Sequence, residues 1–247
     1  MKEIIITPPN RPILDTQLSD FLNTKESSID ILNAKIAEYI RKAGYGTKEG
    51  VIASLLAISQ DFEHDFGVKL PYCFYGGHNN TNLTKFHPDY LDGDNYGVNP
   101  YWGKKIEPAI FVPKVKTTYH YIGLDCSGII GWALYNSGYK HINRSTKGLL
   151  DGWHDNNHDY EPIGINHTDD CYIGEPGDFI YKPGHIVVIV HTDALHGFYY
   201  AVEAKGKEYG VIISKYSIKE IALDNKYTII EMDDYYQDTN NLVLKPN

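Results

Sequence analysis

The sequence is poor in sulfur and in uninterrupted apolar stretches. Of its 247 residues only three are cysteine and two are methionine, and Cys73, Cys126 and Cys171 show no C-x-x-C spacing. An odd number of unpaired cysteines argues against a disulfide framework and leaves at least one free thiol. No run approaches the roughly 18 apolar residues that a membrane-spanning helix needs. We therefore expect no membrane span.

Positive charge is scarce as well. Lys and Arg number 23 against 32 Asp and Glu, which gives a formal net charge of −9. This balance argues against non-specific nucleic-acid binding and against attachment to an anionic membrane surface. No glycine-rich phosphate loop precedes a predicted helix, and we expect no cofactor. The first nine residues contain no usable signal-peptide core, so the chain is either not secreted by that route or is a fragment or mature form.

The apolar content of 42% and the aromatic content of 13% are typical of a folded protein with a full core. Residues 1–27 are polar and contain proline, which predicts an N-terminal arm or linker. One domain is expected over 28–232, with a large loop insertion at 78–122, followed by a polar C-terminal surface tail at 233–247.

Helical periodicity comes first in the chain and strand periodicity last. Apolar spacing predicts helices from about 28 to 44, from Thr47 past residue 62, after Cys126, and near 146–153. Predicted strands span 178–181, 185–191, 198–204, 210–214 and 227–232. This order predicts an α+β fold in which N-terminal helices pack on a mainly antiparallel sheet of five or six strands.

A thiol stands at the start of one predicted helix, in the stretch Asp125-Cys126-Ser127-Gly128. Asp125 is expected to cap the helix by accepting hydrogen bonds from its first N–H groups. A cysteine at a helix N-terminus lies at the positive end of the helix dipole, which predicts a lowered thiol pKa. Cys126 is therefore a candidate nucleophile, whereas Cys73 and Cys171 are interpreted as plain thiols.

Two later strands each carry one polar residue in an otherwise apolar run. His185 begins Gly184-His185-Ile186-Val187-Val188, and Glu203 lies in Tyr200-Ala201-Val202-Glu203-Ala204. Neighbouring antiparallel strands can set this histidine beside this carboxylate. A thiol nucleophile needs a base, and the base needs an orienting group. The three residues Cys126, His185 and Glu203 therefore predict a catalytic triad, although the sequence gives their order and not their distances.

These segments resemble the NlpC/P60 cysteine peptidases of bacterial cell walls. The family motif D-C-S-G matches at Asp125, P-G-D-[LF] at Pro176, and H-V-[GA]-[IV] at His185. Tyr72 with Gly76-Gly77 is similar to the family's aromatic-Gly-Gly segment, and 202–211 to its third-residue strand and hairpin. The resemblance spans roughly residues 30–232 and implies a papain-like fold reduced to a Cys-bearing helix on a curved antiparallel sheet.

The resemblance also implies roles. Cys126 would be the nucleophile and provide part of an oxyanion hole through its N–H, His185 the general base and acid, and Glu203 the third residue. Asp125 and Ser127 would cap the helix and contact the free amine of a stem peptide. The candidate substrate-binding aromatics are Tyr72, Tyr75 and, in the insertion, Trp102. One extra residue in the aromatic-Gly-Gly segment leaves open whether Tyr72 or Tyr75 faces the substrate.

One further departure from the family pattern and one separate stretch keep alternatives open. The interval from His185 to Glu203 is longer than usual, so His191 and His196 remain outside candidates for the third role. The histidine and aspartate residues of 154–159 have the look of a metal site, but the stretch lacks helical spacing and a solvated loop is preferred, with no metal expected.

The implied activity is hydrolysis of peptidoglycan stem peptides, of the γ-D-glutamyl–diamino acid endopeptidase type. Alternatives are an N-acetylmuramoyl-L-alanine amidase or other acyl transfer on the same scaffold, and an inactive module that binds cell wall or a partner. We expect a monomer in an extracellular, cell-wall or phage-lysin setting, a location that the missing signal peptide leaves uncertain.

Overall fold

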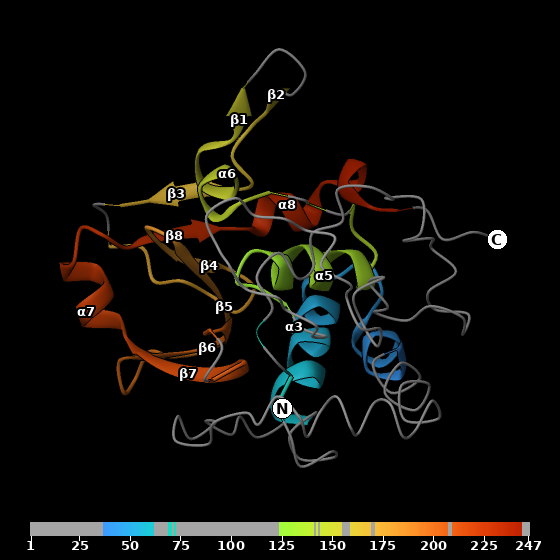
Figure 1. Cartoon of the computed structure of the whole chain (residues 1–247), viewed down its shortest axis with the longest axis horizontal. Helices are drawn as coiled ribbons and strands as arrows, with labels where there is room; N and C mark the ends of the chain where they lie inside the picture. Colours follow the sequence, from blue (N-terminus) through green and yellow to red (C-terminus); the bar gives the residue numbers. More distant parts are fainter. Residues whose placement is uncertain are drawn as a thin grey trace, which may run out of the picture.

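The computed structural model describes residues 37–61, 69–70, 72, 124–140, 142, 144–154, 159–168, 171–206 and 209–243 (Figure 1). The predicted arm at 1–27 and the insertion at 78–122 lie outside these residues. Within them no helix is long and apolar enough to cross a membrane.

The protein is a mixed α/β structure built on a six-stranded sheet. The strand order is β3-β8-β4-β5-β6-β7, and every pair of neighbours is antiparallel. The strands are β3 (Ile165–His167), β4 (Phe179–Lys182), β5 (His185–Asp193), β6 (Phe198–Ala204), β7 (Val211–Ser217) and β8 (Thr228–Glu231). The prediction of a mainly antiparallel sheet of five or six strands is thus confirmed. A separate two-stranded sheet, β1 (Trp153–His154) with β2 (Asp159–Tyr160), and β3 itself were not predicted.

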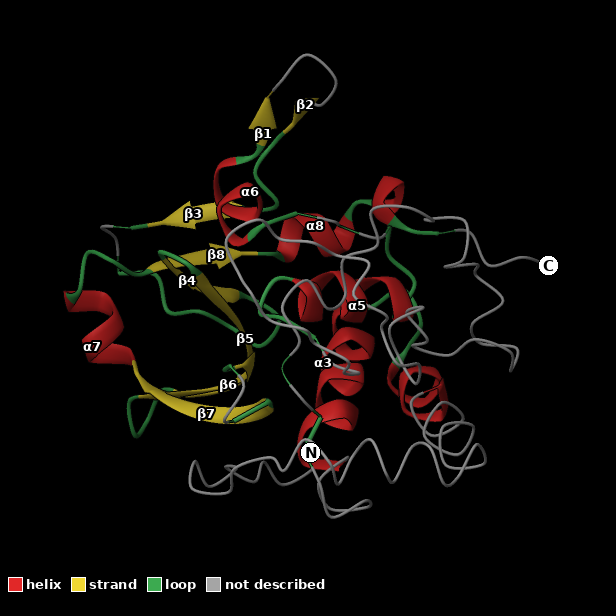
Figure 2. Cartoon of the chain, viewed as in Figure 1, coloured by secondary structure: helices red, strands yellow, loops and turns green. Residues whose placement is uncertain are grey.

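Helices lie on both sides of the sheet. Residues 37–43 are helical, followed by α3 (Lys48–Leu56) with a π-helical turn η1 (Ala57–Asp61), α5 (Gly128–Asn136), α6 (Thr146–Asp151), α7 (Ile218–Leu223), α8 (Asp233–Gln237) and the short η4 (Thr239–Asn241). α3 and α5 lie together on one side and α7 on the other (Figure 2). Thr47 caps α3 as predicted, because its hydroxyl accepts a hydrogen bond from the Gly50 N–H at 3.2 Å.

The alternating side chains of β5 contribute to two separate apolar clusters. Ile186, Val188 and Val190 pack in the larger cluster with residues of α3 and α5, including Leu55 and Trp132. Val187 and Ile189 pack with Ile221 of α7 in the smaller one. Each such buried side chain contributes roughly 1.5–3 kcal/mol through the hydrophobic effect. The helix α5 is buried at every residue except Tyr135, and this fixes the thiol-bearing end against the sheet.

The segment 233–243, expected as part of a polar surface tail, contains α8 and η4 and contacts the rest of the fold. The hydroxyl of Tyr236, a residue only 9% exposed, donates to the Gly177 carbonyl at 2.9 Å. The Lys140 N–H donates to the Asn241 carbonyl and the Val243 N–H to the Gly138 carbonyl, which ties this segment to the chain just after α5. The polar composition of 233–243 did not indicate that Tyr236 would be buried or that the backbone of this segment would form hydrogen bonds with the rest of the chain.

Candidate active site

The start of α5 is organised by Asp125. Its Oδ1 accepts hydrogen bonds from the Gly128 N–H at 2.6 Å and from the Ser127 hydroxyl at 3.3 Å, and both polar residues are 6% exposed. The predicted cap is therefore present, since Asp125 satisfies an N–H that the first helical turn leaves without an intrahelical partner. At the other end of α5, Gly138 adopts a φ of +100°, in the left-handed region that favours glycine.

The Cys126 side chain lies against the first residues of β5. It is 8% exposed, and the Ile186 N–H donates to its sulfur. The pairing of β5 with β6 begins at Val188 and Val202, so the Ile186 N–H lies before the paired part of β5 and is available to the thiol. The thiol therefore contacts the peptide that joins His185 to Ile186.

The predicted lowering of the thiol pKa is wrong for this resting structure. The pKa of Cys126 is raised to about 11, first by burial and then by the neighbouring Asp125 carboxylate, against smaller opposite effects of backbone N–H groups. Desolvation of the thiolate thus outweighs stabilisation by the helix N-terminus. At neutral pH Cys126 is a protonated thiol, and it needs a base before it can act as a nucleophile.

His185, at the start of β5, and Glu203 of β6 form a partly buried pair. The distance from His185 Nε2 to Glu203 Oε2 is 2.6 Å, and the side chains are 19% and 1% exposed, respectively. Burial alone would raise the pKa of Glu203, but the hydrogen bond from His185, together with Ser214 and the charges of His185 and Lys205, lowers it to about 2. Glu203 is consequently a carboxylate at all physiological pH values and orients the imidazole.

The imidazole geometry indicates which ring nitrogen is available for the thiol proton. Because Nε2 is engaged with Glu203, Nδ1 is the nitrogen that can exchange a proton with Cys126. In the part of the chain that the structure describes, no hydrogen bond joins the thiol to the ring directly. The structure thus brings His185 and Glu203 into contact and places Cys126 at the adjacent peptide.

Of the candidate aromatics, the structure describes Tyr72 alone. Tyr72 forms a parallel bridge with Leu124, close before Cys126 in the chain, and the neighbouring Leu70 carbonyl accepts from the Val211 N–H at 2.8 Å. Tyr75 and Trp102 lie outside the described residues, so the choice between the two tyrosines stays open. The half-buried Tyr72 is placed on the segment beside the thiol.

The two outside candidates for the third role lie toward the other end of β5. His196 pairs with Asp193 at 2.8 Å and is 68% exposed, while the His191 ring packs at 5.6 Å from the Tyr200 ring. Glu203 holds the position beside His185.

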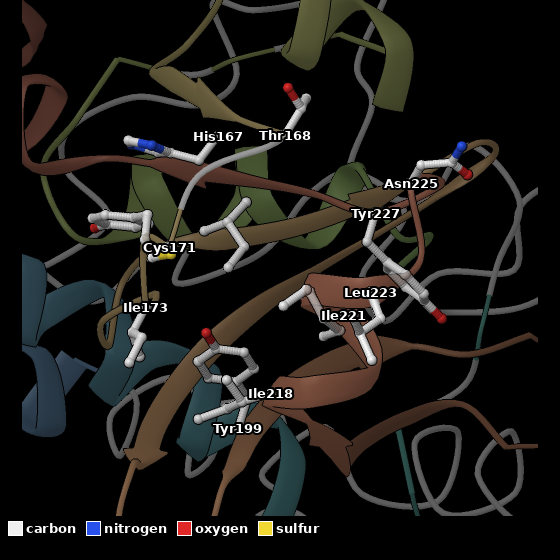
Figure 3. A pocket seen from close by; sticks show the side chains of 13 residues that line it. His167, Thr168, Cys171, Ile173, Tyr199, Ile218, Ile221, Leu223, Asn225 and Tyr227 are labelled. Atoms are coloured by element: carbon white, nitrogen blue, oxygen red, sulfur yellow. The ribbon is translucent and has the colours of Figure 1, made fainter.

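A second polar cluster, which sequence reasoning missed, borders a cavity on the α7 side of the sheet (Figure 3). The cavity has a volume of about 530 Å³ and is lined by residues of β8, of α7 and of 167–168 and 171–173, with Cys171 at its wall. His167 Nε2 lies 2.7 Å from Glu231 Oε2, and its ring stacks on Tyr172 at 4.0 Å. The sequence did not indicate this cluster, because His167 belongs to β3, a strand that was not predicted. None of Cys126, His185 and Glu203 lines the cavity.

Within the described residues no group of three His, Cys, Asp or Glu side chains gathers as metal ligands would. The histidine and aspartate pattern of 154–159 lies largely outside the residues whose side chains are described. The site around Cys126 contains instead a thiol, an imidazole and a carboxylate, the residue types that carry out nucleophilic attack and proton transfer.

A scan against protein-family models found no match, and comparison with curated proteins and with solved structures found none either.

Proposed function

We propose that the protein is a papain-like cysteine hydrolase of the NlpC/P60 type that cleaves amide bonds in peptidoglycan stem peptides. The single observation that carries the proposal is the His185–Glu203 pair, 2.6 Å apart, at the start of the strand whose Ile186 N–H contacts the Cys126 thiol. The substrate class comes from the motif resemblance at Cys126, Gly177-Asp178 and His185. The proposed bond is the one between γ-D-glutamate and the diamino acid.

The proposed first half-reaction forms a thioester. The Cys126 sulfur attacks the substrate carbonyl carbon while its proton passes to Nδ1 of His185, and Glu203 stabilises the resulting imidazolium. The carbonyl oxygen becomes an oxyanion that accepts a hydrogen bond from the Cys126 N–H. Collapse of this intermediate breaks the C–N bond, and the leaving amine takes the proton from His185.

The second half-reaction returns the enzyme to its starting state. His185 takes a proton from water, the resulting hydroxide adds to the thioester carbon, and the C–S bond breaks. The acid product leaves and the sulfur recovers its proton from the imidazolium. A thiol pKa of about 11 makes this shuttle necessary, since hardly any thiolate exists before the substrate binds.

The test is mass spectrometry of muropeptides released from defined peptidoglycans. Wild-type protein is expected to release fragments with a new amino terminus at the diamino acid, and Cys126→Ala to release none. Cys171→Ala is the matched control, because Cys171 is a free, exposed thiol on the other side of the sheet. Equal release by Cys126→Ala and wild type would overturn the proposal.

A further inference from the structure

Glu203 is approached from a second direction by a cation. Lys205 Nζ lies 3.3 Å from Glu203 Oε1, the carboxylate oxygen that does not bond His185. Oε1 is buried and accepts no hydrogen bond of normal geometry among the described residues. The charge of Lys205 thus helps to compensate the carboxylate for its lost hydration, together with the hydroxyls of Ser214 and Tyr216 on β7.

Neighbouring residues contact both the backbone and the ammonium group of Lys205. The Lys205 N–H donates to the Gly210 carbonyl at 2.9 Å, and Nζ lies 5.8 Å from the centre of the Tyr209 ring. The side chain is 41% exposed, so its charge is partly hydrated and carries a smaller desolvation cost than Glu203 at 1%. This arrangement lets one buried carboxylate be shared between a histidine and a lysine.

Three other polar groups face Glu203. His185 faces it from β5, and the hydroxyls of Ser214 and Tyr216 face it from β7. Burial, followed by the charge of Glu203, raises the pKa of Tyr216, which therefore stays protonated. Lys205 thus brings a positive charge to this carboxylate, and its removal changes the charge that His185 experiences.

We propose that Lys205 is a positioning residue that fixes the Glu203 carboxylate and sets the pH range in which His185 can accept the Cys126 proton. The inference rests on the proposed function only in assuming that Cys126 and His185 exchange a proton. Lys205 opposes a second positive charge on the nearby imidazole, because like charges disfavour protonation.

The test is the rate at which iodoacetamide alkylates Cys126, measured against pH by mass spectrometry of the Cys126 peptide in the full chain. In this reaction sulfur displaces iodide from the reagent's carbon, and the thiol proton passes to His185 and then to solvent. Peptide mapping separates Cys126 from Cys73 and Cys171, and no peptidoglycan is needed.

We expect Lys205→Gln to move the acid-side midpoint of this rate profile upward by about half to one pH unit. Lys205→Arg, which keeps the charge, is expected to keep the wild-type midpoint. Lys147→Gln is the matched control, because Lys147 also pairs with a carboxylate, that of Asp151 on α6, and is expected to shift nothing. Thermal melts of all variants check that each is folded.

An unchanged midpoint in Lys205→Gln, a downward shift, or an equal shift in Lys147→Gln would overturn the inference. Failure of the proposed function is seen separately, as a wild-type protein whose Cys126 alkylates with the expected profile while peptidoglycan stays intact.

Discussion

Acid is expected to remove a defined part of the stability of this fold through Glu203. The pKa of this carboxyl is lowered from its ordinary 4.5 to about 2 in the folded state. A group whose folded pKa is depressed stabilises the fold above its unfolded pKa, and this stabilisation is lost as pH falls through the folded pKa. At 1.36 kcal/mol per pH unit, the difference between 4.5 and about 2 corresponds to about 3 kcal/mol at pH 7.

The perturbation that isolates this contribution is Glu203→Gln, which keeps the shape and removes the titration. At pH 3 the ionised Glu203 contributes less than half of the stabilisation that it contributes at pH 7. The difference in unfolding free energy between wild type and Glu203→Gln should therefore shrink by about 2 kcal/mol between pH 7 and pH 3. Asp178, whose pKa is raised by burial, contributes with the opposite sign but equally in both proteins.

The assay is urea denaturation of both proteins at several pH values, with free energies from linear extrapolation. Glu161→Gln, at an exposed carboxyl, is the control and should stay within about 0.5 kcal/mol of wild type throughout. A gap between wild type and Glu203→Gln that does not change with pH would refute the reasoning, since it would mean that Glu203 is not ionised at a depressed pKa.

Four further outcomes are expected, for variants at three residues. Asp125→Ala should lower the free energy of unfolding by about 1 kcal/mol in denaturation assays, because the helix cap is lost. Asp125→Asn should keep the cap and lower the pKa of Cys126, measured by alkylation, because a negative charge beside the thiol is removed. Tyr236→Phe should cost about 1 kcal/mol through the lost hydrogen bond to the Gly177 carbonyl, seen as a lower melting temperature. In His185→Ala, alkylation of Cys126 should rise about tenfold per pH unit up to about pH 11, because the thiol then ionises without a base.

The strands that sequence analysis predicted are those with strong local signals. β5 and β6 are apolar runs bounded by Gly184 and Gly197, each in the left-handed region at a tight turn, and their limits were predicted within two residues. The short β3 is exposed at two of its three residues and carries no apolar alternation, so nothing in the sequence marked it. α7 has only six residues, too few for a helical period to be distinguished from its neighbours.

Some features of the candidate site could likewise be predicted from the sequence and others could not. Residue types and chain order predicted that His185 and Glu203 would meet, because two adjacent antiparallel strands each carried one polar residue in an apolar run. The thiol pKa could not be predicted, because it depends on how deeply the fold buries Cys126. Lys205 was also missed, since its effect on Glu203 depends on where the chain turns after β6.

The strand order of the sheet sets a sequence of events during synthesis. β8 is the last strand in the chain, yet it pairs with β3 on one side and β4 on the other. Until the ribosome has released residue 231, β3 lacks its sheet partner and β4 presents an open edge of backbone N–H and C=O groups. A nascent chain that stalls before β8 would therefore expose an edge suited to pairing with another chain. The unfinished protein, more than the finished one, is where chaperone protection matters.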